Sequence, residues 1–141
     1  MANPALLRAT GPDAARFLHS QLTHEVEGVA VGEGNLQARV TRTGHLQALL
    51  SLHRLAPETF LLLTATSEAT ALLADLDAFL FADQVTFTAD TSLRWIAVQG
   101  PLAADLLDAA LPHAEPWAAL PENAVRPLRS PAARNRESAE K

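Results

Sequence analysis

Residues 35–53, with the sequence NLQARVTRTGHLQALLSLH, carry the pattern that decides which fold is predicted for this chain. Apolar and polar residues alternate over Asn35–Thr41 and again over Leu46–His53. This period of two is typical of β-strands that bury one face. Arg42–His45 separates the two runs and contains Gly44, which can adopt the positive φ that tight turns require. The stretch therefore predicts a long antiparallel hairpin.

The alternation predicts one buried and one largely polar face of this hairpin. The residues expected in the core are Leu36, Ala38, Val40, Leu46, Ala48, Leu50 and Leu52. The polar face is either an ordinary solvated face, which antiparallel sheets commonly have, or a face that binds a ligand or docks another lobe. The candidate site residues on this face are Gln37, Arg39, Thr41, Gln47, Ser51 and His53.

The segments around the hairpin alternate between strand-like and helix-like patterns. Short apolar runs indicate strands, and apolar residues repeated every three or four positions indicate amphipathic helices. Gly-Pro turns precede two of the helical segments, at Gly11-Pro12 and Gly100-Pro101. The expected further strands are 5–10, 60–65, 84–88 and 93–98, and the expected helices are 13–22, 69–80 and 103–111.

This order of elements predicts an α+β domain over residues 4–112. Its sheet is expected to be mixed but largely antiparallel, with the helices on one face, in a ferredoxin-like arrangement. Prolines recur through residues 113–141, and the end of the chain is small and charged. This tail is therefore predicted to be largely disordered.

Composition excludes several classes of protein. Of the 141 residues, 48% are hydrophobic and 19% charged, as is ordinary for a globular domain. No apolar run reaches the roughly 18 residues of a transmembrane helix, and the start of the chain lacks the apolar core of a signal peptide. No membrane association and a cytoplasmic location are therefore expected. The net charge of -5 argues against direct binding to nucleic acid.

The residues that carry chemistry form no recognisable catalytic or metal motif. Without cysteine, the chain has no thiolate for a disulfide, a zinc ion or an iron–sulfur cluster. His19 and His24 do not have the spacing of a His-Glu-x-x-His zinc site. His45 and His53 are separated by roughly 26 Å of strand, too far apart to bind one ion. No catalytic residue and no metal ligand are therefore assigned.

Five segments of the chain match, in order, the motifs of one family. They contain a Gly-Pro-Asp-Ala turn with a Phe-Leu helix, the run Gln-Leu-Thr-His-Glu-Val, a Gly turn and long strand ending in Arg-Leu, the strand Phe-Leu-Leu-Leu, and Ala-Val-Gln-Gly-Pro. The segments are Leu7–Leu18, Gln21–Val26, Gly44–Leu55, Phe60–Leu63 and Ile96–Leu107. Over about residues 5–111 the chain thus resembles the folate-binding family that unites glycine-cleavage T-proteins (aminomethyltransferases) with YgfZ-like proteins.

The resemblance implies one lobe of the family's cloverleaf-like fold, in which tetrahydrofolate binds in a central cavity between lobes. T-proteins transfer a methylene group from an aminomethyl-lipoyl carrier to tetrahydrofolate. YgfZ-like proteins bind folate and support the making or repair of iron–sulfur enzymes and some tRNA modification. The resemblance therefore implies tetrahydrofolate as the cofactor and folate as the small-molecule partner.

One departure from the family favours the YgfZ-like role. T-proteins carry an Asp-Asp pair on the second hairpin strand, where a carboxylate assists the folate chemistry. The corresponding positions here are Ala48 and Leu49, and neither can exchange a proton. The resemblance therefore implies a folate-binding lobe without catalysis of its own. Aminomethyl transfer is an alternative if Asp83 or Glu25 reaches the folate. A non-catalytic module that self-associates through the polar hairpin face is another.

A second departure concerns the later half of the family. YgfZ-like proteins carry there a Lys-Gly-Cys-Tyr-x-Gly-Gln-Glu motif, whereas this chain has neither cysteine nor tyrosine. Family members are also much longer. The chain is therefore expected to be a shortened gene product or a fragment that contributes one lobe, with another chain as a candidate partner that completes the fold.

Overall fold

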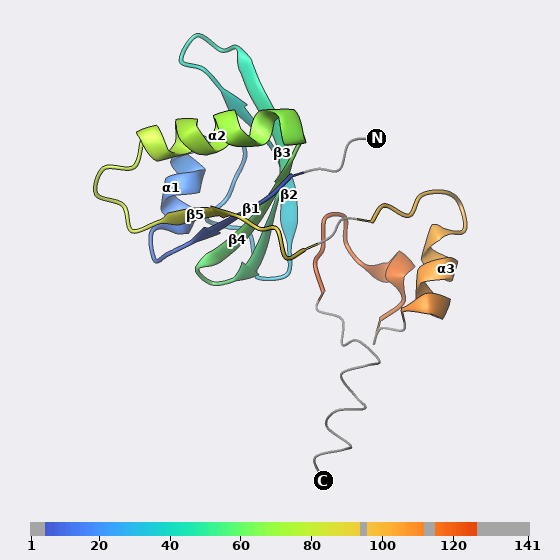
Figure 1. Ribbon diagram of the computed structural model, residues 1–141. Coiled ribbons are helices and arrows are strands. Elements are labelled where there is room, and N and C mark those ends of the chain that lie inside the picture. Colours follow the sequence, from blue (N-terminus) through green and yellow to red (C-terminus); the bar gives the residue numbers. More distant parts are fainter. Residues whose placement is uncertain (1–4, 94–95, 112–114, 127–141) are drawn as a thin grey trace. The chain divides into compact units, whose positions relative to one another are not determined.

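The computed structural model describes residues 5–93, 96–111 and 115–126 of the chain (Figure 1). It has two compact units. The first comprises the described residues of Met1–Ala97 together with Pro121–Val125, and the second comprises those of Val98–Leu120 and Arg126–Lys141. The first unit contains the sheet and the two depressions that are described below as candidate sites.

A five-stranded sheet in the order β2-β3-β4-β1-β5 forms the first unit. The strands are β1 (Ala5–Thr10), β2 (Gly34–Val40), β3 (Leu46–Ala56), β4 (Thr59–Thr64) and β5 (Thr86–Ala89). The predicted hairpin is β2 and β3, and a register shift between Arg39 and Val40 marks a bulge near its turn. Every pairing among these strands is antiparallel, so the predicted α+β class is confirmed and the sheet is antiparallel rather than mixed.

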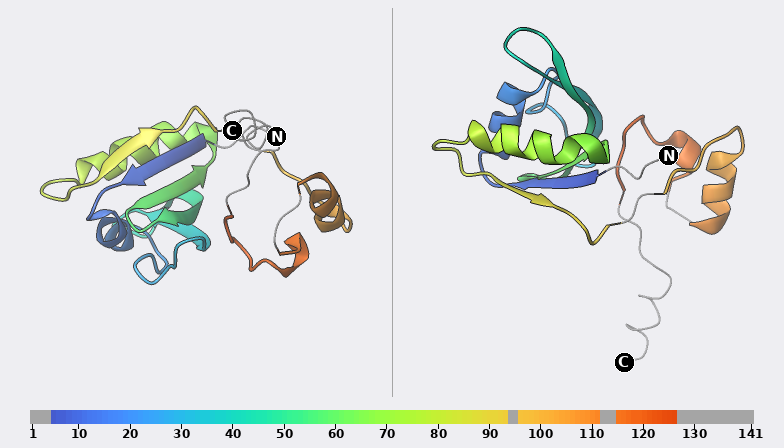
Figure 2. Two further views of the ribbon diagram at one scale, coloured as in Figure 1. Left: turned by 90° about the horizontal axis from the view of Figure 1, so that it is seen from below. Right: turned by 45° about the horizontal axis from the view of Figure 1, so that its top comes forward.

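Two helices, α1 (Ala14–Gln21) and α2 (Thr66–Ala78), cover one face of this sheet. Figure 2 shows α2 running across that face. The core between the layers consists mainly of leucine and phenylalanine, and its largest members are Leu7, Phe17, Leu18, Leu22, Leu50, Leu52, Phe60, Leu62, Leu72 and Leu76. The sheet members share a face because residues that are paired across antiparallel strands point the same way.

The turn between β1 and α1 packs tightly against the segment that precedes β5. Gly11 has a φ of +140°, and its N–H donates a hydrogen bond of 3.0 Å to the carbonyl oxygen of Glu58. The Asp13 carboxylate accepts a hydrogen bond of 2.8 Å from the backbone N–H of Gln84. A Cβ on Gly11 would overlap the carbonyl oxygen of Gln84, so glycine is required here for both space and conformation.

The second unit contains α3 (Ala103–Ala110) and a short 3-10 helix, η1 (Trp117–Ala119). The backbone N–H of Trp117 donates to the Asp108 carboxylate at 2.9 Å, and its indole N–H donates to the carbonyl oxygen of Leu111 at 3.0 Å. These two bonds connect η1 to the end of α3.

The prediction of a strand over Leu93–Val98 is wrong for its described residues, which form no strand; residues 94–95 lie outside the described residues. Ile96 is 82% exposed, because no strand of the described part pairs with this apolar run.

Of the predicted tail, residues 113–114 and 127–141 also lie outside the described residues. Pro121–Val125 belongs to the first unit, where the Val125 N–H donates to the carbonyl oxygen of Gly32 at 2.8 Å. The boundary at residue 112 stays a prediction.

Candidate functional site

The six predicted site residues do not share one face of the hairpin. Gln37 pairs with Leu50 and Arg39 pairs with Ala48, so both polar residues point into the core beneath the helices. Gln37 is 3% exposed and Arg39 is 7% exposed. The predicted burial of Leu36 is wrong, since 65% of it is exposed on the opposite face. The face assignment of the whole β2 strand is thereby inverted.

Gln37 is buried because its side chain forms hydrogen bonds with backbone groups of the loop that covers the edge of the sheet. Its side-chain oxygen accepts a hydrogen bond of 2.8 Å from the N–H of His24. Its side-chain nitrogen donates to the carbonyl oxygen of Glu25 at 3.2 Å and to the side-chain oxygen of Asn35 at 2.7 Å. These bonds give Gln37 a structural function between β2 and the loop, and they leave it little capacity to bind a ligand.

Arg39 is buried because it joins β2 to the C-terminal ends of both helices. Its Nε donates to the Asp75 carboxylate of α2 at 2.7 Å. Its Nη1 donates to the backbone and side-chain oxygens of Gln21, at the end of α1, at 2.8 Å and 2.7 Å. The guanidinium also lies over the ring of Phe79, 5.1 Å from its centroid.

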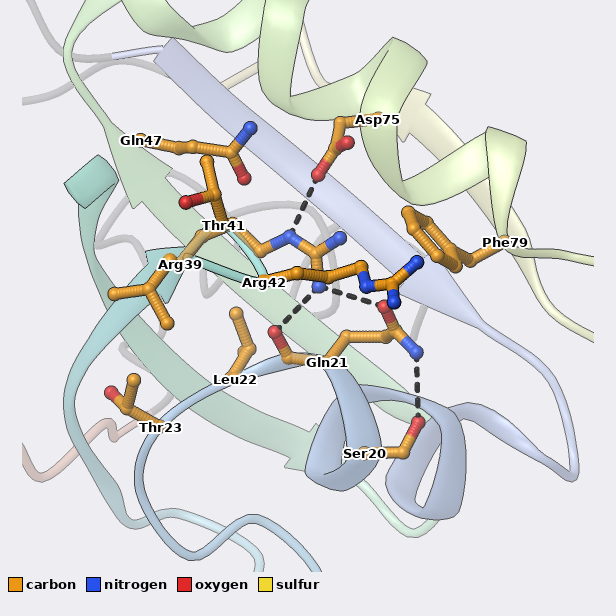
Figure 3. Close-up of a pocket in the computed structure, with 11 residues that line it drawn as sticks. Ser20, Gln21, Leu22, Thr23, Arg39, Thr41, Arg42, Gln47, Asp75 and Phe79 are labelled. Atoms are coloured by element: carbon orange, nitrogen blue, oxygen red, sulfur yellow. Dashed lines mark hydrogen bonds and ion pairs between the residues drawn. The ribbon is translucent and has the colours of Figure 1, made fainter. Parts of the chain in front are cut away.

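A cavity of about 470 Å³ opens beside Arg39, and we call it the polar pocket (Figure 3). It brings together three of the predicted residues, Arg39, Thr41 and Gln47. The remaining walls come from the end of α1, from the hairpin turn and from the end of α2. These walls comprise Ser20, Gln21, Leu22, Thr23, Val40, Arg42, Asp75 and Phe79.

The opposite face of the hairpin carries a second depression, which we call the apolar hollow. Ser51 lies there in a cross-strand row with Leu36 and Leu63. Leu49 also lines the hollow. It is 62% exposed, whereas leucine is among the residues most often fully buried in proteins. The hollow has a volume of about 320 Å³, and its lining of described residues includes no acidic side chain.

Sequence reasoning missed most residues of both depressions. Leu49 gave a usable signal, because it is the one leucine in the otherwise polar half of the alternation over Leu46–His53. Asp75 and Phe79 gave none, because they meet Arg39 only once α2 has folded back over the sheet. The predicted site thus divides, with Arg39, Thr41 and Gln47 lining the polar pocket and Gln37 and Ser51 lining the apolar hollow. The side chain of Gln37 is engaged on the helix side of the sheet, so it does not serve a ligand in the hollow.

His53, the sixth predicted residue, lies near the end of β3 and binds the segment that returns from the second unit. Its Nδ1 is 3.0 Å from the carbonyl oxygen of Asn123, a residue with a φ of +61°. Burial lowers the pKa of His53 below its usual value, and the hydrogen bond to Asn123 acts in the opposite direction but is the smaller effect. His53 therefore lines neither depression, and its role is to anchor this segment.

Stability is expected to depend on His53 as the pH falls from about 7.5 to about 5.5. The imidazole protonates near pH 6.5 in the unfolded chain but only at lower pH in the folded chain, where its pKa is depressed. The unfolded state then binds protons preferentially, so the contribution of His53 is complete above about pH 6.5 and is lost below it. Urea denaturation at both pH values measures the loss. His53→Gln is expected to remove this component, whereas the exposed His45→Gln retains it. Identical pH dependence of all three proteins would contradict the assignment.

The described part of the chain lacks two further classes of site. No group of three or more His, Cys, Asp or Glu side chains there is arranged to hold a metal ion. Among the same residues, no helix combines the length and the apolarity needed to cross a membrane.

A family model and a solved structure place this chain with the same group of proteins. Residues 4–129 match the family model described as the GCVT N-terminal domain. The structure is similar to the glycine cleavage system aminomethyltransferase T of Bartonella henselae, with 25% sequence identity and a TM-score of 0.72. The match covers 86% of this chain but only 32% of that protein. No curated protein matches the sequence.

Proposed function

The chain belongs to the family of the GCVT N-terminal domain, and on this premise we propose that it is a YgfZ-like lobe that binds a folate in the apolar hollow without catalysing a reaction itself. The proposal places the ligand on Leu36, Leu49 and Ser51. Of the residues expected from the sequence, only Ser51 is kept for this ligand. Tetrahydrofolate is the proposed cofactor.

The observation that carries the proposal is the exposure of large apolar side chains on an ordered sheet face. Leu36 and Leu49 are both more than half exposed, and as diagonal neighbours on β2 and β3 they form an apolar floor for a planar ring. Covering a leucine side chain contributes about 1.5–3 kcal/mol when it becomes fully buried. Ser51 supplies a hydroxyl at the same site, which can bind a polar edge of the ring.

The absence of a carboxylate from the hollow's described lining argues against aminomethyl transfer. Ala48 is 2% exposed on the helix side, and Leu49 presents only a hydrocarbon to the hollow. Asp83 forms an ion pair of 2.8 Å with Arg16. Glu25 accepts a hydrogen bond from the N–H of Gly28 at 2.6 Å. Neither carboxylate lines the hollow, so a bound folate would find no general acid or base there.

The biological role that fits such a lobe is the YgfZ-like one, support of iron–sulfur protein maturation and of tRNA modification. The chain spans 32% of the length of the aminomethyltransferase it resembles. We propose that another polypeptide segment covers the hollow and completes the folate cavity, because one sheet face alone leaves a bound ring open to water.

Titration of the full chain with folinic acid, followed by calorimetry, tests the proposal. Saturable binding is expected, and Leu49→Asn is expected to weaken it by about tenfold through the lost apolar contact. Val31→Asn is the matched control, since Val31 is 53% exposed but lies in a loop outside the hollow. No saturable binding up to about 1 mM, or equal weakening by both variants, would refute the assignment.

A further inference from the structure

The polar pocket has the dimensions of a small-molecule site and is separate from the hollow. It is bounded by three elements, the end of α1, the β2–β3 turn and the end of α2 (Figure 3). Its volume of about 470 Å³ falls within the range of about 300–1,000 Å³ in which small-molecule pockets lie. Arg39 points into it from the helix side of the hairpin, whereas Leu36 and Leu49 of the hollow face the other way.

The charges of the pocket do not cancel. Two guanidinium groups, of Arg39 and Arg42, line it together with a single carboxylate, that of Asp75. Asp75 is paired with the Nε of Arg39 at 2.7 Å. Arg42 forms no ion pair within the part of the chain that the structure describes. The pocket therefore has one cationic side chain in excess, which favours a ligand with a single negative charge.

Donors that are still available lie beside this excess charge. The hydrogen bonds of Arg39 to described residues use Nε and Nη1, which leaves the Nη2 protons for a ligand. Arg42 carries a complete guanidinium fork, whose geometry matches the two oxygens of a carboxylate. The side-chain amide of Gln47 lines the same cavity.

Part of the remaining wall is apolar, so the pocket favours a ligand that has an apolar part. Phe79 is 42% exposed, and Leu22 and Val40 line the cavity with it. One face of the Phe79 ring lies against the Arg39 guanidinium, and this fixes the ring as a flat wall. A fully hydrated inorganic anion would leave these walls uncovered, whereas an apolar body would cover them.

We propose that the polar pocket is a second ligand site, which binds a small organic carboxylate with an apolar body. Arg42 is the principal binding residue for the carboxylate, Arg39 provides a second donor held in place by Asp75, and Phe79 packs against the body of the ligand. Binding of a carboxylate in the polar pocket does not require a folate in the hollow.

Benzoate is the probe that tests the site, with benzamide as its uncharged counterpart and inorganic phosphate as an anion without an apolar body. A ligand of this size is expected to bind with a Kd on the order of 1 mM, measured from nitrogen-15 chemical shifts of the full chain. Benzamide and phosphate are each expected to bind at least about tenfold more weakly. The shifts should concentrate at Ser20, Arg42 and Gln47.

Two variants locate the binding. Arg42→Gln is expected to weaken benzoate binding about tenfold or more. Because Arg42 is exposed, this substitution is expected to change the stability of the fold little. Arg16→Gln, which removes another exposed arginine outside the pocket, is expected to change nothing. Leu49→Asn is likewise expected to leave benzoate binding intact, so failure of the folate proposal and failure of this one are distinguishable. The absence of saturation at about 50 mM benzoate, equal binding of benzamide, or indifference to Arg42→Gln overturns the proposal.

Discussion

Replacing Arg39 with alanine is expected to lower the free energy of unfolding by about 3 kcal/mol. The side chain is 8% exposed and donates to Asp75 and to two oxygens of Gln21. Without the guanidinium, the Asp75 carboxylate, whose side chain is 29% exposed, and two oxygens of Gln21 lose their donor, and water replaces it only in part. The C-terminal ends of α1 and α2 also lose their common attachment to β2. Urea denaturation followed by circular dichroism measures the change.

Two further variants identify the cause of this loss. Arg39→Met keeps an apolar stem beside Phe79, so it is expected to recover the packing part of the loss but not the hydrogen-bonded part. Arg42→Ala removes an exposed arginine three residues away and is expected to cost less than about 0.5 kcal/mol. If Arg39→Ala and Arg42→Ala unfold at the same urea concentration, Arg39 does not hold the helices to the sheet.

Gly11→Ala is expected to destabilise the first unit by at least about 3 kcal/mol. The new Cβ would overlap the carbonyl oxygen of Gln84, which belongs to the backbone and has little freedom to move away. The φ of +140° also lies in a region that residues with a side chain avoid. Both the turn into α1 and the approach to β5 would have to rearrange. Thermal and urea denaturation of the variant measure the effect.

Two other glycines separate the steric effect from the conformational one. Gly44 has a φ of +84° but open space around its Cβ position, so Gly44→Ala is expected to cost about 1 kcal/mol from backbone strain alone. At Gly34 the φ is unexceptional but a Cβ would overlap the carbonyl oxygen of Leu52, so crowding alone acts there. An equal loss for Gly11→Ala and Gly44→Ala would rule out the close packing against Gln84.

Much of the fold could be predicted because its elements are local. The hairpin of β2 and β3, the helices α1 and α2, and the strand that became β4 all follow from short repeats of apolar residues. The apolar run at 93–98 follows the same rule, yet its described residues form no strand. A strand needs a neighbour to satisfy its backbone hydrogen bonds, and a local pattern does not say whether one exists.

The candidate site could be predicted only in part because period-two alternation does not state which face is inside. In β3, Ala48, Leu50 and Leu52 go inward as expected and are 2%, 4% and 0% exposed. The predicted burial of Leu46, at the start of this strand, is wrong, since it is 59% exposed. In β2 the same rule fails for Gln37 and Arg39. Their burial is favourable because the loop backbone at His24 and the carboxylate of Asp75 lie where these polar groups can bind them.

The sequence by itself determined which chemistries are absent and where the hairpin lies. A chain without cysteine has no thiol chemistry in any fold, and alternating residues around a glycine turn specify a hairpin locally. Only the tertiary structure decided that Arg39 would line a pocket on the helix side of the hairpin. It also decided that Leu36 and Leu49 would line a hollow on the opposite face. The physical reason is that burying a polar group is favourable only when partners meet it. Those partners, Gln21 and Asp75, are brought to Arg39 from elsewhere in the chain only by folding.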